Sequence, residues 1–324
     1  MAYLMRKINV ALMVLLMTSV GYTYGYDNNW SACEGSEYCC PCEPDCCGEG
    51  FISAGLIYWR AFEDGLDTCV SNHTSNTVLD DGTVVSKTYG KGRDPNFEWN
   101  PGFRIGAGYK FACSNWDIAA FWTHFNSNSH GSKNKGNHAR WKLDFDVVDV
   151  LGAYDFNLGS CFVLRPFGGV RGARIDQKVH RGSLSSTTTF LTTDEVIPSS
   201  KNKEDFWGVG PIAGLAGDWN VGCGFSLYAN GSVSWLYGKF DNKLFEGDRS
   251  IDTLDICIER KHLDAIITAV DTEVGIRWAT CLCKNMQFVL QFGLEHHQYY
   301  NFNRIGCCGD LSFDGFNLTA GIEF

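Results

Sequence analysis

Phe313-Asp-Gly-Phe-Asn-Leu-Thr-Ala-Gly-Ile-Glu-Phe324 is the stretch that decides the fold, because from Phe316 onward its apolar and polar residues alternate strictly. A period of two is that of a β-strand with one apolar and one polar face. A soluble antiparallel sheet shows the same pattern. Here, however, the pattern recurs along the chain, and several of the polar faces carry charge. That combination is expected of a closed barrel with lipid outside and water inside.

The overall composition agrees with such a barrel and argues against other classes of protein. The 324 residues suffice for one large domain, and they include 14 % aromatic residues, 36 glycines and only 7 prolines. The formal net charge of −10 argues against nucleic acid as a partner. The mean hydropathy of −0.15 argues against a helical membrane protein, but alternation allows a barrel to have such a value.

The amino-terminal region is predicted to be a secretory signal peptide, residues 1–21. A basic pair precedes an apolar run from Ile8 to Val20, and Ser19-Val20-Gly21 provides a cleavage site of small residues. The run is short for a transmembrane helix, and an uncleaved anchor is the alternative. A polar, cysteine-rich periplasmic segment (residues 22–50) is expected next, followed by the barrel domain (residues 51–324).

Ten alternating segments predict an all-β fold, a transmembrane antiparallel up-and-down β-barrel of about ten strands. The segments lie at about 51–62, 99–112, 116–128, 140–157, 162–181, 204–218, 225–240, 260–279, 286–302 and 313–324. Long and short connections alternate between them, as in outer-membrane barrels with long outer loops and short periplasmic turns. A hairpin hidden in residues 63–98 would raise the count to twelve. The 140–157 segment changes phase after Val147, which predicts a β-bulge.

Charged residues on the polar faces of these strands are the candidates for lining the barrel lumen. Arg or Lys facing lipid at the midplane costs about 2–4 kcal/mol, so these residues should face water or one another. They either line a pore or pair across a nearly filled lumen. The six basic candidates are Arg104, Lys110, Lys142, Arg165, Arg171 and Arg277, and the eight acidic ones are Asp117, Asp144, Asp146, Asp218, Asp271, Glu273, Glu295 and Glu323. The small acidic excess predicts a slight cation preference.

Aromatic residues cluster near the ends of the predicted strands. Trp and Tyr suit the lipid headgroup zone, because they combine an apolar body with a polar edge. An interfacial girdle is therefore predicted, with ordinary core packing as the alternative, for Trp99, Trp116, Trp141, Trp207, Trp219, Trp235, Tyr237, Tyr299 and Tyr300.

Five short stretches carry a family resemblance through their order and spacing. They are Phe97-Glu-Trp-Asn-Pro-Gly-Phe-Arg-Ile-Gly-Ala-Gly-Tyr109, Arg165-Pro-Phe-Gly-Gly-Val-Arg-Gly-Ala-Arg-Ile-Asp-Gln177, Trp207-Gly-Val-Gly-Pro211, Gly224-Phe-Ser-Leu-Tyr-Ala-Asn-Gly231 and Gly293-Leu-Glu-His-His297. Over about residues 51–324 the chain resembles the major outer membrane proteins of the Legionella and Chlamydia-like type. The resemblance implies a cysteine-rich porin of the outer membrane that also helps to build the envelope.

Fifteen cysteines point to an oxidising compartment and to disulfides. The spacing Cys39-x-x-Cys42 also suits zinc, but the cluster contains adjacent cysteine pairs and no histidine. No cysteine falls inside a predicted strand. Eleven belong to the periplasmic side, Cys33, Cys39, Cys40, Cys42, Cys46, Cys47, Cys113, Cys161, Cys223, Cys281 and Cys283, and four to the outer loops, Cys69, Cys257, Cys307 and Cys308. An odd periplasmic number predicts disulfide links to other copies or to other cysteine-rich envelope proteins.

The predicted function is passive diffusion of small solutes through an outer-membrane porin, together with disulfide cross-linking of the envelope. The alternatives are a non-conducting structural or adhesive barrel and a membrane-embedded hydrolase. Neighbouring His296 and His297 should point to opposite strand faces, and no Ser–His–acid set can be assembled on one face, so no enzyme is predicted. No cofactor or metal is expected. The expected partners are outer-membrane lipids and the barrel-assembly machinery, with Phe324 resembling its terminal aromatic signal.

Overall fold

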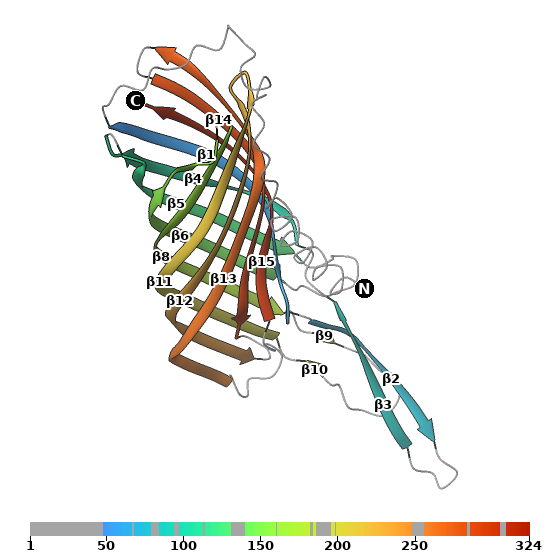
Figure 1. Ribbon diagram of the computed structural model, residues 1–324. Coiled ribbons are helices and arrows are strands. Elements are labelled where there is room, and N and C mark those ends of the chain that lie inside the picture. Colours follow the sequence, from blue (N-terminus) through green and yellow to red (C-terminus); the bar gives the residue numbers. More distant parts are fainter. Residues whose placement is uncertain are drawn as a thin grey trace. The chain divides into compact units, whose positions relative to one another are not determined.

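The computed structural model describes residues 48–66, 68–78, 84–93, 97–112, 114–130, 140–159, 161–181, 184–185, 196–197, 199–247, 256–283, 286–304 and 309–324. Ten antiparallel strands close into a barrel, because β8 pairs with β11 as well as with β6 (Figure 1). In order around the barrel the strands are β11 (Ser199–Gly222), β12 (Phe225–Gly247), β13 (Ile256–Cys283), β14 (Met286–Asn303), β15 (Gly309–Glu323), β1 (Glu49–Glu63), β4 (Trp99–Lys110), β5 (Trp116–His130), β6 (Arg140–Tyr154) and β8 (Phe162–Arg181). The short strand β7 (Phe156–Asn157) continues the line of β6 along β8. No helix in the described part of the chain has the length and apolar character of a membrane span.

The first and last barrel strands in chain order, β1 and β15, pair with each other, and we call this pairing the seam. β1 pairs with β15 from Phe51 opposite Glu323 to Glu63 opposite Leu311. Next to the Phe51–Glu323 pair, Gly50 and Phe324 exchange two backbone hydrogen bonds of 2.7 and 2.8 Å. Alternation therefore extends through Phe324, whose half-exposed side chain points outward like that of Leu318.

Two small sheets lie outside the barrel pairing. β2 (Thr68–Val78) and β3 (Val84–Arg93) form a hairpin, and β9 (Leu184–Ser185) pairs with β10 (Val196–Ile197). The hairpin considered for residues 63–98 is thus present, but it forms a sheet of its own. The barrel therefore has ten strands rather than twelve.

Long and short connections alternate around the ring, as predicted. The connections β4–β5, β6–β8, β11–β12 and β13–β14 are short, and we call their side of the barrel the short-turn end and the opposite side the long-loop end. The β11–β12 turn consists of Cys223 and Gly224, at φ values of 54° and 78°. Positive φ at both positions matches the right-handed twist of a two-residue hairpin. In outer-membrane barrels the short turns face the periplasm.

Several strands are much longer than a membrane requires. β11, β12 and β13 contain 24, 23 and 28 residues, whereas about 9–11 tilted residues cross a bilayer. The barrel therefore continues beyond the lipid. The prediction that no cysteine falls inside a strand is wrong. Cys257, Cys281 and Cys283 lie in the long strand β13, and Cys69 lies in β2 of the separate hairpin.

The strand β6 shows how the polarity of the barrel changes along its length. Its register with β5 and β8 is continuous, so the predicted β-bulge is wrong. Near the long-loop end, Trp141, Leu143, Phe145 and Val147 are buried inside. Further along, the inward position passes to Asp149, while Val148 and Val150 point outward and are about half exposed. The apparent phase slip is a reversal of inside and outside polarity.

Because of this reversal, the prediction that three residues of β6 line the lumen is wrong. Lys142, Asp144 and Asp146 alternate with the buried residues of β6 and therefore point outward. Asp144 accepts a hydrogen bond from the exposed Asn126, and Asp146 accepts one from Trp122 on the outer surface.

The outer surface carries the apolar belt and most of the predicted girdle. Outward residues with large exposed apolar side chains include Ile52, Leu56, Ile105, Ile118, Val170, Leu215, Ile276, Leu294 and Leu318. Of the girdle candidates, Trp99, Trp116, Trp207, Trp219, Trp235 and Tyr237 are exposed in the same way. Trp141 and Tyr299 are only 0 % and 1 % exposed, so for these two the alternative of core packing is correct.

Candidate functional site

The inside of the barrel at the long-loop end is filled by a hydrophobic core. Its 21 buried residues come from nine of the ten barrel strands, all but β4, together with Leu66 beyond the end of β1. The largest of them are Trp59, Trp141, Tyr299, Phe125, Phe206, Phe240, Phe302 and Phe313. Because contributions come from nearly all sides of the ring, this core lies across the lumen rather than along one wall.

Aromatic contacts between strands that are not neighbours show this directly. The ring of Phe125 in β5 lies 5.8 Å from that of Phe313 in β15. The ring of Phe145 in β6 lies 4.7 Å from Phe313 and 5.7 Å from Tyr299 in β14. Since β5 and β6 are not adjacent to β14 or β15, these contacts cross the barrel interior.

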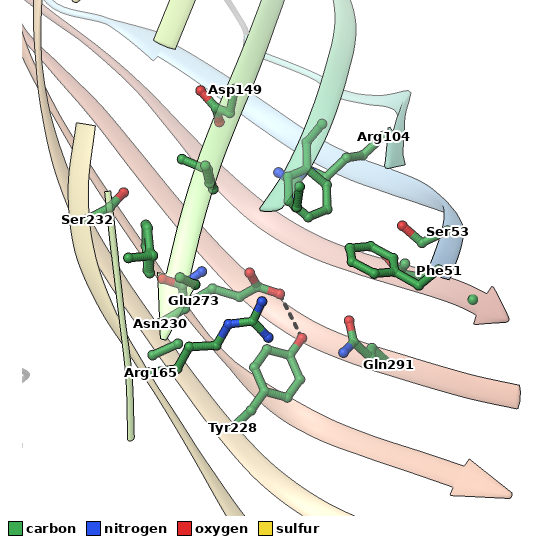
Figure 2. A pocket seen from close by; sticks show the side chains of 18 of the residues that line it. Phe51, Ser53, Arg104, Asp149, Arg165, Tyr228, Asn230, Ser232, Glu273 and Gln291 are labelled. Atoms are coloured by element: carbon green, nitrogen blue, oxygen red, sulfur yellow. Dashed lines mark hydrogen bonds between the residues drawn. The ribbon is translucent and has the colours of Figure 1, made fainter. Parts of the chain in front are cut away.

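Towards the short-turn end the interior opens into a cavity of about 500 Å³. Trp59, Phe145 and Tyr299 of the core contribute to its lining, and Glu49, Lys110 and Glu323 line it near the strand ends. Figure 2 shows Arg165, Tyr228 and Glu273 around this space, projecting from β8, β12 and β13. The Tyr228 hydroxyl donates a hydrogen bond of 2.7 Å to the Glu273 carboxylate.

The deepest ion pairs of the cavity centre on Arg171. Its guanidinium donates to both carboxylate oxygens of Asp149, at 2.7 and 2.9 Å, and also to Asp271 across the lumen. Asp271 in turn contacts Nδ1 of His297 at 2.7 Å. The side chain of Arg171 is only 8 % exposed. Removing one partner of such a buried pair is strongly destabilising, because the other charge is left uncompensated.

A second buried group of charges lies beside Trp59. Glu295 accepts hydrogen bonds from Arg104 Nη1 at 2.6 Å and from the Trp59 indole at 2.7 Å. Asn317 donates to both Glu295 and Glu273, which connects this group to the rest of the cavity lining. The apolar core and the charged cavity are therefore joined by Trp59, which belongs to both.

Nearer the short turns, further ion pairs line the cavity. Arg165 Nη2 lies 2.6 Å from Asp117, Lys110 lies 3.1 Å from Asp155, and Arg277 lies 2.9 Å from Asp218. Besides His297, the cavity lining contains five Arg or Lys side chains, Arg104, Lys110, Arg165, Arg171 and Arg277, and eight acidic ones, Glu49, Asp117, Asp149, Asp155, Asp218, Asp271, Glu273 and Glu323. It therefore has an acidic excess.

His297 is the one candidate here for acid–base chemistry, and its surroundings do not form a catalytic set. Its Nδ1 faces Asp271, and its Nε2 lies 3.5 Å from Glu295. The nearby hydroxyl of Ser232 donates to Asp271 rather than to the ring. Ser232 and His297 therefore do not form the nucleophile–base hydrogen bond of a hydrolase. As expected, His296 points the other way and pairs with Asp314.

A separate carboxyl pair lies at the long-loop end, beyond the outward-facing Trp207 and the apolar belt. Gln177 donates one hydrogen bond to Glu63 at 2.8 Å and one to Glu204 at 2.9 Å. Burial raises the pKa of Glu204 to about 7, against the lowering effect of hydrogen bonds from Gln177 and from the Arg304 backbone. Burial likewise raises the pKa of Glu63.

Most of the predicted lumen residues come together in this cavity. Ten of the fourteen line it, Arg104, Lys110, Asp117, Arg165, Arg171, Asp218, Asp271, Glu273, Arg277 and Glu323, and Glu295 lies buried behind Arg104. Sequence reasoning missed Asp149, Asp155, Tyr228 and His297. Asp149 was detectable, because unbroken alternation from Val147 places it inward, whereas the pairing of His297 with Asp271 depends on the register between the neighbouring strands β14 and β13.

Three predicted disulfide candidates are described with their side chains. Cys161 immediately precedes β8, Cys223 is in the β11–β12 turn, and Cys281 is near the end of β13, so all three lie at the short-turn end. The cluster from Cys33 to Cys47, Cys113, Cys307 and Cys308 lie outside the described residues.

The fold and its apolar outer belt define an outer-membrane β-barrel. The family model of the Legionella pneumophila major outer membrane protein precursor matches residues 41–319, and the chain belongs to this family of the outer membrane. No curated protein matches the chain.

Three solved structures illustrate the similarity of fold. The outer membrane protease OmpT from Escherichia coli is 14 % identical, with a TM-score of 0.41 over 86 % of this chain and 96 % of that one. The translocator domain of the autotransporter NalP from Neisseria meningitidis is 10 % identical, with a TM-score of 0.41 over 86 % and 88 %. The toluene transporter TodX from P. putida is 10 % identical, with a TM-score of 0.31 over 86 % and 89 %.

Proposed function

We propose that this protein is a structural barrel of the outer membrane whose lumen is closed to solutes at the long-loop end. The observation that supports this most directly is the aromatic core, whose rings meet across the lumen from non-adjacent strands. An ion that crossed this core would lose its hydration without gaining a charged partner, which is costly in an apolar medium. The non-conducting alternative is therefore favoured over an open porin.

Planar-bilayer recording of the refolded protein tests this proposal. The wild-type barrel should insert without steady conductance. A variant that truncates two contacting core rings, Trp59→Ala with Phe313→Ala, should show conductance if it folds. Steady channel conductance of the wild type would contradict the closed state.

Passive diffusion of small solutes is the second candidate, because the cavity has the charged, water-accessible lining of a pore. It requires the core to move aside. The lining holds eight acidic residues against five Arg or Lys residues and His297, which then gives weak cation selectivity, stronger at low salt, where screening is weaker. The reversal potential across a salt gradient measures this selectivity, and a strong anion preference would contradict the assignment of the lining.

The second part of the proposal is that the protein cross-links the envelope through its cysteines. It is supported by their number and by the position of Cys161, Cys223 and Cys281 at the end where the short turns lie. The partners are other copies of the chain or other cysteine-rich envelope proteins. Non-reducing gels of intact envelopes should show multimers that reductant collapses, and replacing the cysteines from Cys33 to Cys47 by Ser should reduce them. A monomer without reductant would contradict cross-linking.

Assembly of the barrel through its last strand also belongs to the proposal. Phe324 extends the pairing of β15 with β1 and points its ring outward, where the assembly machinery can contact it. Deleting Phe324 should lower the heat-modifiable, folded fraction in the membrane, whereas Phe324→Tyr should preserve it. Equal folded fractions of wild type and deletion variant would exclude this role.

The proposed function includes no catalysis. The support is the pairing of His297 Nδ1 with Asp271, together with a hydroxyl of Ser232 that donates to Asp271 rather than to the imidazole ring.

A further inference from the structure

Basic side chains are concentrated on the outer surface of four neighbouring strands, β6, β8, β11 and β12. Strand alternation places eight of them outward near the long-loop end: Arg140, Lys142, Arg174, Lys178, Lys201, Lys203, Lys239 and Lys243. We call these eight residues the basic face. Among the described residues, the outward positions of β14, β15, β1, β4 and β5 hold a single basic residue, Arg60.

This concentration is opposite in sign to the charge of the whole chain. The same outward positions of the four strands hold five carboxylates, Asp144, Asp146, Asp176, Asp205 and Asp241. On these four strands, eight basic against five acidic residues leave an excess of three positive charges, on a protein whose formal net charge is −10. Asp264 and Glu259 of the adjacent strand β13, opposite Lys239 and Lys243, offset part of this excess. The excess is therefore local, and it points to an anionic partner.

The strand register arranges four of these lysines in one row. Lys142 is directly opposite Lys178, Lys178 is opposite Lys203, and Lys203 is opposite Lys243. Two residues closer to the apolar belt along each strand, the same register places four aspartates in a second row, Asp144, Asp176, Asp205 and Asp241. Each row runs across all four strands.

A row of like charges is unfavourable in the protein alone. Directly opposite side chains have Cβ atoms about 4.5–5.5 Å apart, and like charges at this spacing destabilise a sheet. Lys203 is partly compensated by Asp205, and Lys243 by Glu259 at 2.8 Å. Lys142 and Lys178 are exposed and form no ion pair with any of the described residues. An anion bound between neighbouring ammonium groups would remove this repulsion.

The basic face begins where the apolar outer surface ends. Trp207, which is 58 % exposed, is directly opposite Arg174 on one side and Lys239 on the other. An outward Trp at the end of an apolar belt belongs at headgroup depth. The basic residues that follow it along the strands therefore lie where lipid head groups carry their phosphates.

We propose that the basic face binds the phosphate-bearing head groups of outer-membrane lipids. Neighbouring ammonium groups of the lysine row can donate to the same phosphate, because charge-assisted hydrogen bonds to phosphate are strong and an ammonium has three donors. A second copy of the chain does not fit as the occupant, because a symmetric contact would bring the same positive excess against itself.

Native mass spectrometry of the refolded full chain in neutral detergent tests this assignment. The probes are lipid A with two phosphates, the same lipid after removal of its phosphates, and inorganic phosphate as a competitor. The wild type should retain the bisphosphorylated lipid and should not retain the dephosphorylated one. Replacing the lysine row by glutamine (Lys142→Gln, Lys178→Gln, Lys203→Gln and Lys243→Gln) should weaken retention by at least about tenfold, since several basic contacts are lost.

The neighbouring aspartate row provides a matched control. Replacing it by asparagine (Asp144→Asn, Asp176→Asn, Asp205→Asn and Asp241→Asn) should leave retention unchanged or strengthen it, because it raises the positive excess. Equal retention by the wild type and the lysine variant would overturn the proposal. Displacement of the lipid by an equal concentration of inorganic phosphate would overturn the assignment to lipid. If the lysine variant does not fold, wild-type retention that is insensitive to salt would also overturn it.

Discussion

The two halves of the barrel have opposite polarity. At the short-turn end the interior holds ion pairs such as Arg165–Asp117, and the outer surface is apolar. At the long-loop end the interior holds packed rings such as Phe125 and Phe313, and the outer surface is charged. The short-turn half therefore follows the rule for a barrel in lipid, and the long-loop half follows the rule for a soluble barrel. One strand can obey both rules in turn, because its two ends meet different solvents.

The comparison also indicates where the barrel obtains its stability. In lipid, apolar outer residues gain little from packing against one another, so the short-turn half relies on buried charge pairs. In water, the long-loop half gains from burying apolar area. Trp59 lies at the boundary, since its ring contacts the core while its indole N–H donates to Glu295. The four predictions below test this division, from the largest expected effect to the smallest.

Truncation at the boundary should have the largest effect. Trp59→Ala removes ring contacts with Phe125, Phe145 and Phe313, and it removes a hydrogen bond to the buried Glu295. We expect a loss of about 4–6 kcal/mol in unfolding free energy, from a core cavity of an aromatic side chain and from a lost buried hydrogen bond. Urea unfolding in lipid vesicles measures it. The control is Trp207→Ala on the outer surface, and an equal loss from both variants would contradict the assigned core.

Breaking the deep ion pairs should cost somewhat less. Arg171→Gln leaves Asp149 and Asp271 without their shared cation, and we expect a loss of about 3 kcal/mol. The same unfolding experiment measures it. Adding Asp271→Asn should restore part of the stability, because it removes one of the uncompensated charges. Strictly additive losses in the double variant would mean that the two side chains do not interact.

The carboxyl pair at the long-loop end should make stability depend on pH. The pKa of Glu204 is raised from 4.5 to about 7 in the folded barrel, so over that interval the unfolded chain releases its proton first. The contribution of Glu204 to stability therefore falls as pH rises from about 4.5 to 7, by a total of about 3 kcal/mol. Glu204→Gln should raise the urea midpoint at pH 8 and leave it unchanged near pH 4. The exposed Glu98→Gln is the control, and identical pH profiles of wild type and Glu204→Gln would exclude this effect.

The smallest effect is expected for the outward-facing pair of His296 and Asp314. Asp314→Asn removes the partner of His296, but both side chains are partly exposed to solvent. Pairs of this kind contribute about 0–1 kcal/mol. Asp271→Asn removes the partner of the neighbouring His297 inside the barrel and should cost several times more in the same unfolding assay. A larger loss for Asp314→Asn would reverse our assignment of the inner and outer faces of β14.

Much of the fold was predictable, because alternation records which solvent each strand face meets. Ten strands, their alternating connections and the outward face of β15 follow from periodicity, and all three are confirmed. The reversal of polarity was not predictable, since the position where a strand leaves the lipid is not encoded in its period. For that reason Lys142 was assigned to the lumen and Asp149 was missed.

The candidate site was predictable only as a list of residues. Placing Arg104, Arg171 and Asp271 inside needed nothing but alternation. Their partners depend on which strands face one another across a closed ring, as for Arg104 in β4 and Glu295 in β14, which are 191 residues apart. The cross-lumen contacts of the core were equally hidden from sequence reasoning, because the rings of the core belong to segments that are far apart in sequence.

The pairing of β1 with β15 determines how late in synthesis and export the barrel can close. Phe51 cannot meet its partner Glu323 until the intervening chain has been made and exported. During that interval β1 has an unpaired edge, which can pair with any other exposed strand. The chain therefore has to be protected from such pairing while it crosses the periplasm, before its ends meet. A chain that ended before β15 would leave one edge of β1 and one edge of β14 permanently unpaired.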